Sequence, residues 1–491
     1  PERRSQILGL EPTNTGQAIA NMMTNLGFFT FLSSPSSAAL NVFGMTAIGI
    51  PMASTKYGYA KITGALTKYI AYYSATPIRQ VPAKDENGRP AVRSIVPDLG
   101  KSPDLTPVQR KAYEKLVEDN VIDTSYTYDI TGMTEKPVPL DESNTEKFMR
   151  YSSALFHHSE RMNRSALGLA IFDAAYEKTG NFEFAVQEAK DLTFRALGDF
   201  TRATKAPIFS RPFGKVAFQF KSYPLQMTYI MLRDFKVMTG ITNDITPQVM
   251  ESQLREDGVS EEEIAQAVTA YKKEMRQFKK QAAKNFFGVM GLTTVIGGLT
   301  AGFPLYSAMA SLIETMSQID DEDEPYEPIY DFDSWFYKWM TEEMGLNNRI
   351  AGAVIRGVPG EYAGLGLSDR VSLDILKLWF RDGLDRGDDE AYLYSLIISN
   401  LGPTVSILAN MGKASNFLRD GEWYRAVEVL APAIVKSPMM AARYAEEGAK
   451  TRSGEYYIKP EEITPLDLFI RAIGFAPEKV LRKQKALIKK K

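Results

Sequence analysis

The chain has 491 residues, no cysteine, and a formal charge of −2 from 58 Lys and Arg against 60 Asp and Glu. This length allows two to four domain-sized units, and the lack of cysteine excludes disulfides, thiolate zinc sites and a cysteine nucleophile. The balanced charge argues against the broadly basic surface of a dedicated DNA-binding protein, so any contact with nucleic acid should be local. The opening Pro1-Glu2-Arg3-Arg4 has neither the apolar core nor the cleavage site of a signal peptide, so we expect a processed or excised piece of a longer protein.

Residues 1–80 are predicted to contain an apolar helical hairpin. No charged residue occurs in residues 12–55, and Ser33–Ser37 divides this stretch into two apolar arms, Ile19–Leu32 and Ala38–Met52. Each arm is shorter than the roughly 20 residues of a membrane span. The pattern therefore fits a re-entrant or interfacial hairpin, and equally a hairpin that packs on the rest of the protein.

Residues 81–143 are predicted to be a polar linker that holds one short helix. Val81–Thr106 is polar and rich in Pro and Gly, with its clearest turn signal at Asp85–Gly88, so we expect an exposed excursion. The short helix is expected over Pro107–Asp119.

Residues 144–284 are predicted to form a helical bundle. Apolar residues recur at helical spacing, Gly180 is expected to end one helix, and Phe182–Leu197 is expected to form the next. Ser260 followed by Glu263 forms a capping box that opens a long helix. The later turns of this helix are basic on one side and apolar on the other, which predicts a basic amphipathic helix suited to lipid headgroups or DNA. Its basic residues are Lys272, Lys273, Arg276, Lys279, Lys280 and Lys284.

Residues 285–319 are predicted to continue this helix as a glycine-rich apolar segment. Asn285–Ile313 is a run of 29 uncharged residues, which makes it the best candidate for a membrane helix by length. Gly298 and Gly302 have small-xxx-small spacing, which would let two helices approach closely. Such glycines serve a membrane span and a buried helix of an oligomer equally well, so both interpretations stay open. The residues assigned to this segment are Gly288, Gly291, Gly297, Gly298, Gly302 and Pro304, the last as a kink.

Residues 320–491 are predicted to be a C-terminal helical region with a basic tail. The acidic run before Pro325 lacks the alternating ligands and the glycine of an EF-hand loop, so we expect a solvated turn. The final Lys489, Lys490 and Lys491 suit the phosphates of lipid or DNA, or form a solvated terminus. Together, these regions predict an all-α fold, an elongated multi-helix bundle with little or no strand.

The sequence offers no catalytic or cofactor site. Its two histidines, His157 and His158, are adjacent, and neighbouring helical residues point about 100° apart, which is a poor geometry for chelating a metal ion. There is no phosphate-binding loop, no nucleophile elbow and no dinucleotide fingerprint. A polymerase or nuclease would need carboxylates placed around metal ions, usually on strands. We therefore expect no enzymatic activity, no cofactor and no metal site.

An aromatic and basic segment covers Pro207–Pro224. Its rings could stack on single-stranded bases, although a core helix entered through a Pro-Gly turn explains them more simply. This segment resembles a region of the very large bacteriophage internal virion proteins that are known by a Pro-Leu-x-Arg-Phe-Gly motif. The motif is degenerate here, because it matches only if Ser210 and Pro212 are treated as insertions. The matching residues are Pro207, Ile208, Phe209, Arg211, Phe213 and Gly214, followed by Lys215.

Further segments resemble the same family in the same order, and together they cover most of residues 16–375. They are Phe31–Val42, Glu160–Arg164, Asp320–Pro325, Arg356–Pro359 and Leu367–Arg370. The resemblance implies the C-terminal portion of a phage protein that is packaged with the genome and delivered into the host cell. In short-tailed phages, proteins of this class form a core above the portal, leave through the tail and reassemble as a conduit for DNA across the bacterial envelope.

From the resemblance we expect an internal virion or ejection protein that forms homo-oligomers and contacts other internal proteins and the portal. It would engage the host inner membrane and, without sequence specificity, double-stranded phage DNA. Its location would be the virion interior and, after ejection, the periplasm and inner membrane of the host. Two alternatives stay open: a purely structural virion core component that never meets lipid, and a non-catalytic tail of a larger virion enzyme.

Overall fold

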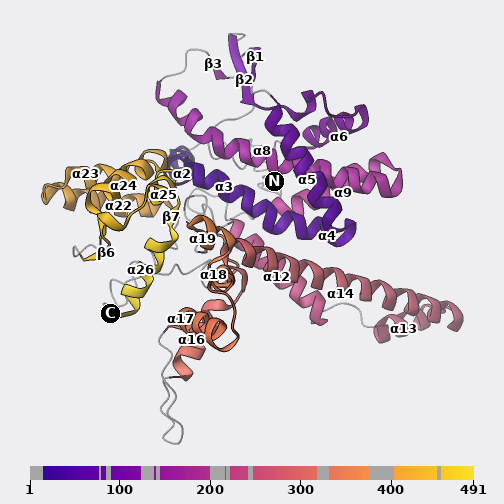
Figure 1. Cartoon of the computed structure of the whole chain (residues 1–491). Helices are drawn as coiled ribbons and strands as arrows, with labels where there is room; N and C mark the ends of the chain where they lie inside the picture. Colours follow the sequence, from indigo (N-terminus) through magenta and orange to yellow (C-terminus); the bar gives the residue numbers. More distant parts are fainter. Residues whose placement is uncertain are drawn as a thin grey trace, which may run out of the picture.

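Figure 1 shows the computed structural model of the protein. The structure describes residues 15–76, 79–84, 90–122, 138–139, 144–198, 216, 222–241, 247–317, 331–368, 370–374, 403–450 and 455–490. Several predicted features lie outside this part of the chain. They are the motif residues Pro207, Arg211, Phe213, Gly214 and Lys215, the turn signal Asp85–Gly88, the acidic segment Asp320–Pro325, and Lys491.

The fold is all-α with many helices, which confirms the predicted class. The N-terminal part contains α2 (Thr15–Leu32), α3 (Pro35–Gly44), α4 (Ile50–Tyr57), α5 (Tyr59–Ala75), α6 (Pro107–Glu118), α8 (Asn144–Thr179) and α9 (Phe182–Leu197). The middle contains α12 (Ser222–Thr239), α13 (Pro247–Glu256), α14 (Glu261–Gly297), α15 (Leu299–Gly302), α16 (Tyr306–Met316), α17 (Phe332–Lys338), α18 (Asn348–Arg356) and α19 (Val358–Ala363). The C-terminal part contains α22 (Pro403–Arg419), α23 (Trp423–Leu430), α24 (Ala433–Glu447), α25 (Pro465–Ala472) and α26 (Glu478–Lys490).

The main core is built around the middle of α8. Residues 163–172 of this helix are buried without interruption, so every side of it is covered, by α3, α5, α6 and α9. Close packing around such a helix requires small residues where its neighbours approach. At Gly168, a Cβ would stand 3.2 Å from a methyl group of Leu116 on α6. Helix α8 therefore organises the N-terminal body, although it follows the predicted linker in the sequence.

Helix boundaries that depend on local capping were predicted correctly. Gly180, with a φ of +66°, ends α8, and the side chain of Asn181 accepts a hydrogen bond from the backbone of Phe184 to begin α9. The predicted capping box of Ser260 and Glu263 opens α14, with both reciprocal hydrogen bonds present. These signals are encoded within a few residues, so tertiary packing does not override them.

The two apolar arms pack on the rest of the protein, as one of the two interpretations predicted, but they do not pack along each other as a hairpin would. Helix α2 lies mainly against α22, α24 and α8. The second arm is longer than expected: α3 continues through a π-helical turn, Met45–Gly49, into α4 and packs on α8 and α14. Pro51 cannot donate the backbone hydrogen bond of a regular helix, and a widened turn just before it accommodates this loss. Each arm thus finds a partner far away in the sequence.

The expectation that residues 81–106 form an exposed linker also needs correction. Two antiparallel strands occupy part of this region, β1 (Arg79–Lys84) and β2 (Pro90–Val96), and a third strand, β3 (Val138–Pro139), pairs with β2. Farther along, Leu99 and Leu105 are buried in the main core. The polar composition marks a small sheet followed by a segment that packs on the body.

The C-terminal part of the chain returns to the N-terminal part. The backbone N–H of Ser36 donates to the carbonyl of Ile473 at 3.0 Å, and the N–H of Ile434 donates to the Ser33 hydroxyl at 3.3 Å. In Figure 1, α22, α23, α24 and α25 gather beside α2, on the opposite side of the molecule from α13. Two further strand pairs fasten this part: β4 (Leu365–Gly366) with β7 (Ala476–Pro477), and β5 (Ala449–Lys450) with β6 (Tyr456–Ile458).

Candidate functional site: a basic arm on a glycine-packed junction

The first half of α14 projects from the body as an arm. Figure 1 shows this half and α13 extending together away from the N-terminal helices. Arg255 at the end of α13 donates to Glu261 at the start of α14, with N–O distances of 2.9 and 3.2 Å. This contact lowers the pKa of the Glu261 carboxyl, because the hydrogen bond and charge of Arg255 favour its ionised form. The acidic residues in the first turn of α14 also interact favourably with the positive end of its helix dipole.

Six cations form a basic face along this arm. All six are exposed, and none of them has an ion-pair partner within the described part of the chain. At about 100° per residue they fall within an arc of about 140°, and at about 1.5 Å per residue they extend over about 18 Å. Most of them line one open hollow along the helix, together with Thr269 and Gln277. The residues of the basic face are Lys272, Lys273, Arg276, Lys279, Lys280 and Lys284.

One of the six cations also has a structural position. The Nζ atom of Lys279 lies beside Gly240, where it would be 2.7 Å from a Cβ on that residue. Gly240 directly follows the last residue of α12, so the ammonium group sits at the carboxyl end of that helix. A positive charge there interacts favourably with the helix dipole and the last carbonyl groups. Lys279 therefore helps to hold the arm against α12.

The single glycine-rich helix expected over 285–313 is wrong, because the chain changes direction at Gly298. Helix α14 ends at Gly297, α15 and α16 follow, and Pro304 lies in the turn between these two helices. Gly298 has a φ of +83°, which favours glycine, and a Cβ there would collide with the backbone carbonyl of Ile355 at the end of α18. The break is thus imposed by tertiary packing that a search for apolar runs does not detect.

The predicted glycines mostly serve contacts within the chain. A Cβ on Gly297 would stand 2.6 Å from that of Ala301, and one on Gly302 would collide with Thr294. Gly288 faces Pro51 and the hydroxyl of Tyr59. Gly291 is the exception, since it is exposed and nothing lies within 4 Å of the place where its Cβ would be. The predicted small-xxx-small pair is therefore not a face of one helix. Gly298 and Gly302 instead pack at the junction, the place where α14, α15 and α18 meet.

One helical segment among the described residues is long and apolar enough to cross a membrane. It is Pro35–Tyr57, with 23 residues and a mean hydropathy of 1.3, and half of it is buried inside the protein. The segment expected to be the best candidate, Asn285–Ile313, is divided among three helices. Length and composition alone also fit a core helix of a soluble protein, and here the helix packs on α8 and α14.

Several segments of the motif resemblance meet in space around the Ser33–Ser37 turn. Asn41 donates to Glu160 at 2.8 Å, and Asn163 donates to the carbonyl of Asn41 at 2.9 Å. Arg370 donates to the Ser36 hydroxyl at 3.1 Å. Segments separated by more than a hundred residues thus make polar contacts with α3 and with the turn before it.

Arg164 shares Glu160 with Asn41, and its role was not predicted. Its side chain is fully buried and donates to Glu160 at 2.6 Å and to the carbonyls of Val121, Leu197 and Gly198 at 2.9–3.3 Å. A buried guanidinium is stable only when it is paired and hydrogen-bonded, and here these partners satisfy it. The arginine fixes the end of α9 and the turn after α6 onto α8. A single arginine in a helical pattern gives no such signal.

The adjacent histidines are not part of a metal centre in the described residues. No group of three or more His, Cys, Asp or Glu side chains in this part of the chain is placed to hold a metal ion. His157 is buried, and burial, then the charges of Arg161 and His158, lower its pKa to about 3. Its imidazole is therefore neutral in the folded protein at neutral pH.

Exposed apolar side chains lie near the junction, on α16 and α17. Leu312 and Met316 on α16 are 59% and 60% exposed, and Trp335 on α17 is 40% exposed. The exposed ring of Trp335 stacks on that of Trp339, which is 39% exposed, and both lie over the buried Phe332 and the partly buried Phe336. Exposed aromatic and apolar groups of this kind are typical of surfaces that contact another protein or a membrane interface.

Comparison with protein-family models, with curated proteins and with solved structures found no match.

Proposed function

We propose that this chain is a non-catalytic bacteriophage virion protein of the internal or ejection type, and that it binds anionic surfaces through the basic face of α14. The observation that carries the proposal is this face: six exposed cations, without ion-pair partners in the described chain, on an arm that projects from the body. DNA phosphates in the virion and anionic headgroups at the host inner membrane both offer the matching charge. The motif resemblance supplies the virion context.

The proposed mode of membrane contact is peripheral. The glycines of the junction are used within the chain, and half of Pro35–Tyr57 is buried against protein. Insertion of either segment would require these contacts to be given up. Lysines and an arginine on an exposed helix can bind headgroups without this cost, each contributing about 1 kcal/mol near an anionic surface.

Self-association belongs to the same proposal. A conduit across the envelope needs several copies of the chain, together with other internal proteins and the portal. The exposed apolar and aromatic groups of α16 and α17 support such contacts, since isolated proteins seldom leave clustered Trp, Leu and Met side chains in water. Helices α16 and α17 extend from the body in a different direction from the basic arm, so one copy could bind a neighbouring copy and an anionic surface at the same time.

The test compares the wild-type chain with a basic-face variant, K272Q/K273Q/R276Q/K280Q. We expect wild-type protein to float with phosphatidylglycerol vesicles, to stay behind with phosphatidylcholine vesicles, and to bind double-stranded DNA of any sequence. The variant should bind both anionic partners at least about tenfold more weakly, because four charge contacts are lost. Lys279 is left intact because of its contact with α12.

A matched control removes the same charge elsewhere on the body, as K101Q/K111Q/K178Q/R349Q, all at exposed positions. Equal losses in the two variants would mean that net charge, and not the basic face, governs binding, and would overturn the proposal. DNA binding without flotation on any vesicle would favour the alternative of a structural core component that never meets lipid. That alternative is kept because so much of the apolar sequence is already covered by protein.

A further inference from the structure

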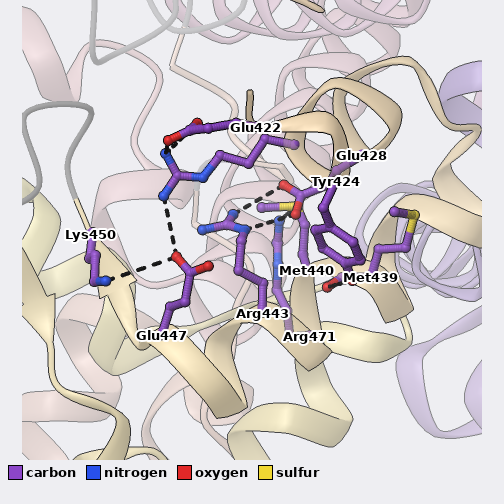
Figure 2. A network of polar contacts seen from close by, with 10 residues as sticks. Glu422, Tyr424, Glu428, Met439, Met440, Arg443, Glu447, Lys450 and Arg471 are labelled. Atoms are coloured by element: carbon purple, nitrogen blue, oxygen red, sulfur yellow. Dashed lines mark hydrogen bonds and ion pairs between the residues drawn. The ribbon is translucent and has the colours of Figure 1, made fainter. Parts of the chain in front are cut away.

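The C-terminal helices contain a second charged cluster, which the proposed function does not use. Figure 2 shows it at the meeting point of α23, α24 and α25. Glu428 on α23 is buried and accepts two hydrogen bonds from Arg443 on α24, at 2.8 and 3.1 Å. Arg425 joins Glu422 and Glu447, and Lys450 lies 3.9 Å from Glu447.

The cluster has more positive than negative charge. Its three carboxylates are Glu422, Glu428 and Glu447, and its five cations are Arg425, Lys436, Arg443, Lys450 and Arg471. The two positive charges of Arg425 and Lys450 are balanced by the two negative charges of Glu422 and Glu447. Around Glu428, however, there are three cations, Lys436, Arg443 and Arg471, and the exposed Lys413 lies close enough to act on Lys436. Positive charge therefore exceeds negative charge there.

Arg471 is the least satisfied of these cations. Its Nε is shielded from solvent and has no hydrogen-bond partner among the described residues, and its NH2 group meets the sulfur of Met440. A thioether is a weak acceptor and carries no charge. The guanidinium groups of Arg471 and Arg443 both lie 5.6 Å from the ring of Tyr444, so the two like charges are held near each other.

Lys436 shares this environment. Burial lowers its pKa, the charge of Glu428 raises it, and Arg471, Lys413 and Arg443 lower it further. Burial likewise lowers the pKa of Arg471 from its usual range. Both shifts reflect positive charge held away from water without enough negative charge nearby, which is unfavourable unless another anion is supplied.

We propose that Lys436, Arg443 and Arg471 bind a phosphate group at the junction of α23, α24 and α25. An excess of positive charge favours an anion with more than one negative charge, and inorganic phosphate or a phosphomonoester carries about −1.5 to −2 at neutral pH. The planar guanidinium of Arg471 can donate two parallel hydrogen bonds to phosphate oxygens, from the Nε and from an NH2 group. This site goes beyond the proposed function, since it lies on the C-terminal helices and not on the arm.

The test measures phosphate binding to the full-length chain by titration calorimetry, with chloride at matched ionic strength as the reference. Wild-type protein should bind inorganic phosphate, and R471M should bind it at least about tenfold more weakly, because the unpaired donor is removed. R425M is the matched control, since it removes the same side chain from the balanced part of the cluster, and it should bind as wild type does. R471K keeps the charge but loses the planar fork, so it should bind phosphate with intermediate affinity. It serves as the test variant if R471M fails to fold.

Two further experiments identify the source of the phosphate and separate this site from the basic face of α14. Binding to phosphatidic acid vesicles that depends on Arg471 would assign the site to a lipid phosphomonoester. Binding of free phosphate alone would assign it to a soluble one. The basic-face variant of α14 should keep phosphate binding, so either proposal can fail without the other. No phosphate-specific heat in the wild type, or equal affinities in wild type, R471M and R471K, would overturn the site.

Discussion

Gly298 and Gly357 lie back to back where α14 and α18 end. Their φ angles are +83° and +79°, and a Cβ on either residue would collide with a backbone carbonyl of the other helix, that of Ile355 or Ile296. Each glycine therefore makes room for the last turn of the helix opposite. The basic arm and the helices after it are joined rigidly through this contact.

Replacement of Gly298 by Ala should lower the free energy of unfolding by about 2–4 kcal/mol, because a strained backbone and an overpacked contact add together. Gly291→Ala is the matched control, since that position is helical, exposed and open. It should raise the free energy of unfolding by about 0.5–1 kcal/mol. Urea unfolding of the two variants measures both values. Similar effects from both substitutions would contradict the packing described for the junction.

Replacement of Arg164 by Met should lower the free energy of unfolding by about 3–5 kcal/mol, because Glu160 and three backbone carbonyls lose a buried donor. Arg255→Met removes an ion pair on the exposed arm and should leave the midpoint of unfolding almost unchanged. Thermal unfolding followed by circular dichroism compares the two. A small effect at Arg164 would show that its hydrogen bonds do not hold α6, α8 and α9 together.

His157 should make the protein less stable in acid. Its pKa is about 3 when folded, against an ordinary value of 6.5 for an exposed histidine, so the unfolded chain binds the proton more readily. This contribution to stability is fully present above pH 6.5 and is lost as the pH falls from 6.5 towards 3, by up to about 1.4 kcal/mol per pH unit. His157→Gln should flatten the slope of unfolding free energy against pH in that window. Above pH 7 the slopes of variant and wild type should coincide.

Lys279 and Lys280 are neighbours on the basic face, and we expect them to behave differently. Lys280→Gln should reduce the slope of log binding constant against log salt for double-stranded DNA by about 0.9, because one phosphate contact is lost. Lys279→Gln should mainly lower the thermal midpoint, since its ammonium group lies at the end of α12 beside Gly240. Anisotropy titrations at several salt concentrations, with melting curves of both variants, separate the two effects. Identical behaviour of the two would refute a structural role for Lys279.

The sequence predicted those features of the fold that are encoded locally. Helix α9 and the start of α14 follow from Gly180, Asn181, Ser260 and Glu263, whose side chains or backbone satisfy the helix ends directly. The all-α class follows from the helical spacing of apolar residues. The basic face was also visible, because a helix of known start places its lysines at known angles.

The sequence could not predict where apolar segments would be buried. The arms of the expected hairpin pack on helices hundreds of residues away, and apolarity alone does not specify a partner. The break at Gly298 exists because α18 approaches there, and small-xxx-small spacing is compatible with a straight helix as well. Lys436 and Arg443 are seven residues apart on one face of α24, but Arg471 comes from α25, and only the folded chain brings it to them.

The hydrogen bonds of Ser33 and Ser36 with Ile434 and Ile473 have a mechanical consequence. They close a loop of chain that contains α8 and most of the main core. Tension applied between the two ends would act on these bonds before it reached the helices inside the loop. A protein threaded end-first through a narrow passage would therefore have to open this contact before its core helices were pulled apart.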